Sequence, residues 1–122
     1  MSIITKEEFL SNKWVSILQL NDWTIDFKYH CSPEEMTLDG VAGEAEYVES
    51  RKYATVRILN KSYYNETTIK YDFEQVLVHE LLHIKFCLFW NDADDNCISN
   101  RLLHQMIDDM AKSLVKAWRR DY

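Results

Sequence analysis

The stretch from Tyr71 to Phe89, YDFEQVLVHELLHIKFCLF, constrains the fold of this 122-residue chain more than any other. Asp72, followed three positions later by Gln75, forms a variant of the capping box and predicts the start of a helix. The helix is then apolar almost all round, at Val76, Leu77, Val78, Leu81, Leu82, Ile84 and Phe86. Such a helix has to be covered by other elements, so we expect it to be buried in the domain.

Three extended segments are predicted before this helix. Strict alternation in WTIDFKYH, residues 23–30, predicts a half-buried strand. Residues 44–50 and 52–59 predict two more strands around a short turn. In the last of them, three apolar side chains should point inward: Ala54, Val56 and Ile58. The strands supply an apolar face against which the helix can pack.

Two further helices complete the predicted fold. A capping box at residues 5–8 opens a helix that should run to about Leu20. After the polar run NDADDN, a last helix is expected from about Ile98 to Trp118. The order α-β-β-β-α-α predicts an α+β fold with a small three-stranded antiparallel sheet. The length is typical of one domain, here residues 1–122.

Composition excludes several classes of protein. Hydrophobic residues make up 47% of the chain, which is enough to form a core. The net charge of −6 argues against a nucleic-acid partner, because nucleic-acid binders present a basic face. No secretory signal and no apolar run long enough to span a bilayer is visible, and the three cysteines lack disulfide-framework spacing. We therefore expect a reduced, cytoplasmic protein with no membrane partner.

The motif HELLH, residues 79–83, lies in the middle of the apolar helix. At 3.6 residues per turn, His79 and His83 project from the same face one turn apart, a spacing that lets both imidazoles bind one Zn²⁺. Glu80 is rotated by about 100° from His79, beside the metal rather than on it. There it can act as a general base that takes a proton from a zinc-activated water.

Two simpler explanations of HELLH compete with zinc. The motif can arise by chance, but chance would not also place it in mid-helix in a chain with only four histidines. His79 and His83 can also be core histidines bonded to other polar groups. Burying two imidazoles and a carboxylate in an apolar helix is costly without a partner that satisfies them. A metal is such a partner, so the sequence favours zinc.

With these residues in view, the chain resembles small zincin-like metallopeptidases, particularly minimal SprT-like and phage- or prophage-encoded ones. Four segments carry the resemblance: LQLNDWTIDF, GEAEYVESRKYATVRIL, VHELLHIKF and HQMIDDMAKSL. The resemblance implies a single zincin-like metallopeptidase domain with His79 and His83 as zinc ligands and Glu80 as catalytic base. The sequence departs from the family in having no downstream cysteine zinc ribbon. It also has no glutamate after Glu80 to serve as third ligand.

His104 is the predicted third ligand. A catalytic zinc site takes three protein ligands and a water, and His104 is the only histidine downstream of His83. If the helix that carries HELLH ends near Phe89 and the chain turns back antiparallel, His83 and His104 come to lie at the same level. The match of HQMIDDMA also implies a ligand at this position. Asp108, one turn on, can orient a ligating imidazole or bind zinc itself, and three loop aspartates remain alternatives: Asp92, Asp94 and Asp95.

The sequence thus predicts a zinc metallopeptidase, a hydrolase that cleaves a peptide or protein substrate. The alternative is a zinc-bound but catalytically idle module on the same fold, of the inhibitor or anti-defence type. An intact Glu80 favours the enzyme, because a structural zinc site has no use for a base. An extended peptide can reach the metal by adding to the sheet at an edge strand, which we expect within residues 44–59.

Overall fold

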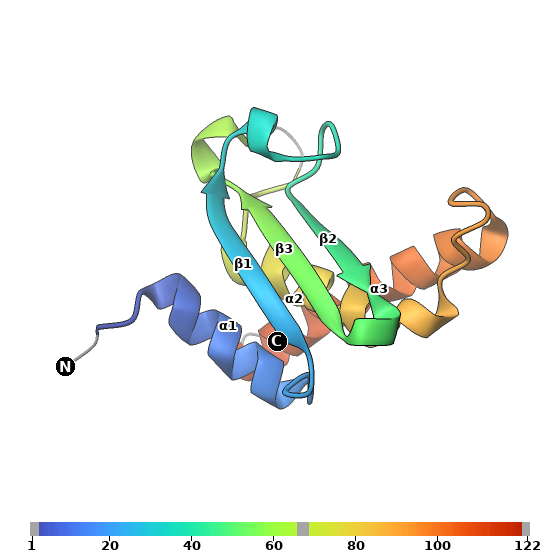
Figure 1. Ribbon diagram of the computed structural model, residues 1–122. Helices are drawn as coiled ribbons and strands as arrows, with labels where there is room; N and C mark the ends of the chain where they lie inside the picture. Colours follow the sequence, from blue (N-terminus) through green and yellow to red (C-terminus); the bar gives the residue numbers. More distant parts are fainter. Residues whose placement is uncertain (1–2, 66–68, 121–122) are drawn as a thin grey trace.

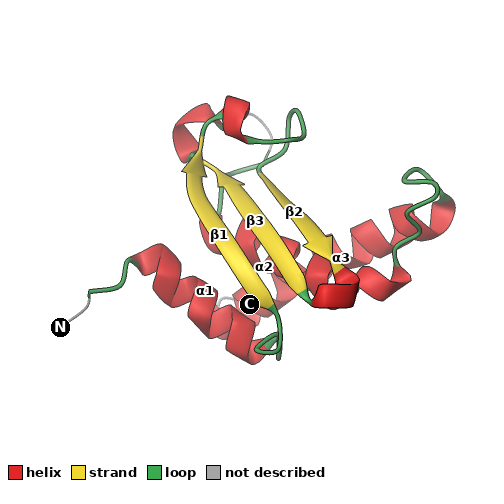
Figure 2. Cartoon of the chain, in the orientation of Figure 1, coloured by secondary structure: helices red, strands yellow, loops and turns green. Residues whose placement is uncertain are grey.

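The computed structural model describes residues 3–65 and 69–120 and is of the predicted α+β class. Its helices and strands are α1 (Lys6–Ile17), β1 (Thr24–Cys31), β2 (Gly43–Val48), β3 (Tyr53–Leu59), α2 (Phe73–Lys85) and α3 (Ile98–Arg119). The strands form one sheet, and α2 and α3 lie behind it (Figure 1). Colouring by secondary structure shows the same two layers (Figure 2). Within the described residues, no helix has the length and apolar character needed to cross a membrane.

The sheet is mixed, so the prediction of an antiparallel sheet is wrong. Its order is β1-β3-β2, with β2 antiparallel and β1 parallel to the central strand β3. A short turn joins β2 and β3 into a hairpin. Strand β3, the second strand of the hairpin, lies between β2 and β1. Strand β3 carries the three inward-facing residues Ala54, Val56 and Ile58, all fully buried. The strand with the most deeply buried face therefore occupies the centre, and the prediction of its inward residues is confirmed.

The helix starts are confirmed, but two helix ends differ from the prediction. Thr5 caps α1 by accepting a hydrogen bond from the Glu8 amide, and Asp72 caps α2 by accepting one from Gln75. Helix α1 ends at Ile17 rather than near Leu20. Helix α2 ends at Lys85 rather than near Phe89, because the chain tightens into a 3₁₀ turn over Cys87–Phe89. Helix α3 agrees with its prediction to one residue.

A buried carboxylate holds the beginning of α2 in place. Glu74 accepts hydrogen bonds from Lys13 Nζ at 2.7 Å and from Trp14 Nε1 at 2.6 Å, both on α1. Arg119, at the end of α3, donates to Glu74 and pairs with Asp72 at 2.7 Å. These contacts fix the N-terminal end of α2 against both α1 and α3.

Candidate metal centre

His79 and His83 lie one turn apart on α2, both half-buried, as the predicted spacing requires. Their Nε2 atoms are 3.2 Å apart. Two nitrogens bound at 2.0–2.1 Å to one tetrahedral zinc ion would lie about 3.3–3.4 Å apart. The pair therefore already has nearly the spacing of two ligands of a single ion.

His104 reaches the same point from α3, which packs beside α2. Its ring centroid lies 5.0 Å from that of His79 and 5.4 Å from that of His83. One ring nitrogen of each of the three histidines falls within 4.8 Å of the others, and His104 is the most exposed of them. The structure thus brings together the three predicted ligands, although α2 ends earlier than the predicted hairpin assumed.

The protonation of the two α2 histidines suits a metal. Burial lowers the pKa of His79, and the nearby His104 lowers it further. Burial, followed by the neighbouring imidazoles, lowers the pKa of His83 to about 4. Both rings are therefore neutral near pH 7, the state in which an imidazole nitrogen can bind a cation. The donor set fits zinc, which binds three imidazoles and retains an open fourth position in catalytic sites.

Asp108 contacts the group of three histidines through His79 and is not itself a member of the group. Its Oδ1 lies 3.3 Å from His79 Nδ1, and its Oδ2 pairs with Lys112 at 2.9 Å. A carboxylate at Nδ1 favours a proton there and leaves the Nε2 lone pair directed at the other histidines. Of its two predicted roles, orientation of a ligating imidazole fits this geometry better than direct ligation.

The loop after α2 covers one side of the cluster. Trp90 packs against the His83 ring with centroids 5.6 Å apart, and its indole N–H donates to Asp95 at 3.3 Å. Asn100 holds this loop by accepting from the Asn91 amide and donating to two of its carbonyls. None of the loop aspartates, Asp92, Asp94 and Asp95, belongs to the metal-binding group found among the described residues.

Glu80 lies beside the histidines and is buried, with 7% of its surface exposed. Strand β2 approaches it closely at Gly43, where an added Cβ would come within 3.3 Å of Glu80 Oε2. Burial and then the charge of Glu44 raise the pKa of Glu80 to about 8. At pH 7 a pKa of about 8 leaves the carboxyl of the metal-free protein mostly protonated, and a cation bound by the histidines would favour the carboxylate that a general base requires.

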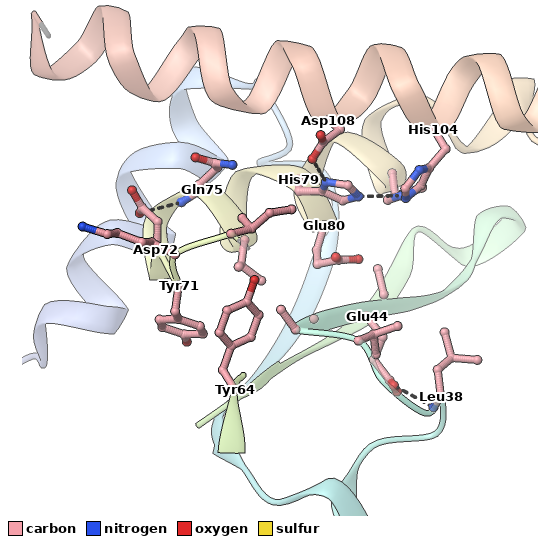
Figure 3. A pocket seen from close by; sticks show the side chains of 18 of the residues that line it. Leu38, Glu44, Tyr64, Tyr71, Asp72, Gln75, His79, Glu80, His104 and Asp108 are labelled. Atoms are coloured by element: carbon pink, nitrogen blue, oxygen red, sulfur yellow. Dashed lines mark hydrogen bonds and ion pairs between the residues drawn. The ribbon is translucent and has the colours of Figure 1, made fainter. Parts of the chain in front are cut away.

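A cavity of about 600 Å³ opens onto this site. Figure 3 shows His104 and Asp108 beside α3, Glu80 in the middle, and Tyr64 and Tyr71 toward the other end, near Gln75. The sequence did not identify the aromatic residues as part of a site. They follow the sheet in a loop without regular periodicity, so no sequence pattern marks them as cavity residues.

No protein-family model matches this chain, and neither the curated proteins nor the solved structures contain a significant match. The resemblance to zincin-like metallopeptidases therefore rests on the sequence segments quoted above and stays a prediction.

Proposed function

We propose that this protein is a zinc-dependent peptidase. The observation that carries the proposal is the convergence of His79, His83 and His104 beside the buried carboxyl of Glu80, in a cavity open to solvent. Three protein ligands with an accessible fourth position are typical of catalytic zinc, whereas structural zinc sites are closed by four ligands. A base next to three histidines also has no purpose in a purely structural site.

The residues of the chain divide the chemistry among them. Bound zinc would supply a Lewis acid that polarises the scissile carbonyl and lowers the pKa of water. Glu80 would accept the proton of the attacking water and deliver it to the departing amine nitrogen. Asp108 would hold His79 in the tautomer that presents Nε2. The cavity walls would position the peptide bond over Glu80.

Strand β2 supports a peptide as the substrate. It lies at the edge of the sheet and begins one residue before the segment 44–59 in which an edge strand is predicted. The Leu59 amide donates to the Ala42 carbonyl, and antiparallel pairs alternate, so the main-chain groups of Gly43, Ala45 and Tyr47 face away from β3. These three residues also line the cavity. An extended peptide can pair with this edge and lie along the metal site.

The proposal is tested with purified protein loaded with one equivalent of zinc and incubated with a broad mixture of peptides. We expect mass spectrometry to detect internal cleavage products that a zinc chelator abolishes and added zinc restores. Stoichiometric zinc without any cleavage would instead favour the idle binding module. Failure to bind zinc would exclude both functions.

A further inference from the structure

We infer that the end of the cavity farthest from His104 is a specificity site for one large apolar side chain of the substrate, such as leucine, methionine or phenylalanine. This inference rests on the proposed peptidase function and names its substrate class. Tyr64 and Tyr71 lie toward this end (Figure 3), and three aliphatic side chains also line the cavity: Val41, Ile69 and Val76.

The aromatic wall of this end is held in place by its own contacts. The rings of Tyr64 and Tyr71 meet edge to face with centroids 5.3 Å apart. The Tyr71 hydroxyl donates to the Leu59 carbonyl at 3.0 Å, which ties the wall to the sheet. Leu59 in turn pairs with Ala42, directly beside Val41. Tyr71 and Ala42 are therefore both attached to Leu59 of β3.

The exposure of Ile69 also indicates an apolar site that a ligand can fill. It lines the cavity, yet 59% of its surface is exposed. An apolar side chain that faces a cavity and stays largely accessible gains free energy when a ligand covers it. Asp72, a carboxylate that also lines the cavity, is already paired with Arg119 and the Gln75 amide, so it does not demand a basic side chain.

The apolar end lies close enough to Glu80 to bind a substrate side chain near the scissile bond. Val76 is four positions before Glu80 on α2, which corresponds to about 6 Å along the helix axis. An extended peptide advances about 3.3 Å per residue. Strand β2 approaches both side chains at Gly43, where an added Cβ would lie 2.6 Å from Val76 Cγ1 and 3.2 Å from Glu80 Cγ. The selected side chain should therefore lie within two residues of the cleaved bond.

Binding of peptides to the metal-free protein tests the specificity site apart from catalysis. Two fluorescein-labelled decapeptides of glycine and serine carry a single central leucine or a single central alanine, and fluorescence polarisation gives their affinities. We expect the leucine peptide to bind about tenfold more tightly. Tyr64→Gln should reduce the difference to less than about threefold, since it removes one wall of the site. Tyr63→Gln, at the exposed neighbouring residue outside the cavity, is the matched control and should preserve it.

A second variant, Ile69→Gln, guards against a folding defect in Tyr64→Gln and should weaken the preference in the same way. Equal affinity of wild-type protein for the two peptides would overturn the inference. An undiminished preference in folded Tyr64→Gln and Ile69→Gln would also overturn it. The proposed function is tested separately. If the protein prefers the leucine peptide in binding but the zinc-loaded protein cleaves no peptide, the apolar site is established and the proposed peptidase activity is contradicted.

Discussion

The Nδ1 atom of His79 lies 3.3 Å from Oδ1 of Asp108, whose other oxygen is paired with Lys112. This contact joins the α2 histidine to α3 and fixes which ring nitrogen faces His83 and His104. It links the packing of two helices to the tautomer that zinc requires.

Removing this carboxylate should weaken zinc binding without abolishing it. In Asp108→Ala, His79 keeps its position on α2 but loses the acceptor that orients it. We expect zinc affinity to fall about 10–100-fold in competition titrations with a chelating indicator. Asp109→Ala, at the exposed neighbouring residue, is the control and should retain wild-type affinity.

His104→Ala should weaken zinc binding more than Asp108→Ala does, because it removes a direct ligand and leaves only the two α2 histidines. The same titration ranks the two variants. Wild-type affinity in His104→Ala together with a large loss in Asp108→Ala would assign the third ligand to Asp108 instead.

Gly43→Ala should destabilise the protein by about 1–3 kcal/mol through overpacking. The added Cβ would lie 2.6 Å from Val76 Cγ1, and valine is too stiff to move aside easily. The free energy of unfolding from urea titrations gives the effect. Val76→Ala removes the clashing atom, so the double variant should be more stable than the sum of the two single effects predicts.

Gly40→Ala is the control for the double-mutant cycle of Gly43 and Val76. Its Cβ would meet nothing within 4 Å, but its φ of 72° strains any residue other than glycine. Val76→Ala should therefore not offset its cost. Strictly additive effects for Gly43 and Val76 would contradict the close approach of β2 to α2.

Carboxylates whose pKa is lowered in the folded state should contribute less stability to the metal-free protein as the pH falls below about 5. Burial alone would raise the pKa of Glu44, but hydrogen bonds from Thr37, Leu38 and Arg57 outweigh it and hold the pKa below its ordinary value. A pKa lower in the folded than in the unfolded protein means that stability is present above the unfolded value, about 4.3, and is lost as the pH falls through the folded value. Glu74 acts in the same direction through Lys13 and Trp14.

Urea titrations between pH 7 and pH 3, with a chelator present, measure this loss. Glu44→Gln should be less stable than wild type at pH 7 and should lose less stability on acidification. An equal pH dependence in the two proteins would show that Glu44 does not contribute.

The elements and the α2 site were predictable because their signals are local. The caps at Thr5 and Asp72 are satisfied within one turn, and the spacing of His79 and His83 follows from helix geometry alone. The structure also brings His104 beside them, although α2 ends at Lys85, because the antiparallel return of α3 matters more than the exact helix end.

The mixed sheet was not predictable from such signals. The alternation of β1, β2 and β3 states which side chains face inward, but not which strand inserts between the others. That choice depends on contacts between residues far apart in the sequence. The same limitation applies to Tyr64 and Tyr71, which line the cavity through contacts with each other and with the Leu59 carbonyl.

The rate of peptide cleavage by Glu80→Gln, compared with wild type at equal zinc content, tests the central claim most directly. Glutamine keeps the volume of the side chain beside β2 but cannot accept the proton of the attacking water. We predict that cleavage falls by about 10²–10⁴-fold or more while zinc stays bound with wild-type stoichiometry. Full activity in the zinc-loaded variant would contradict the role of Glu80, and loss of zinc would contradict its position beside the metal.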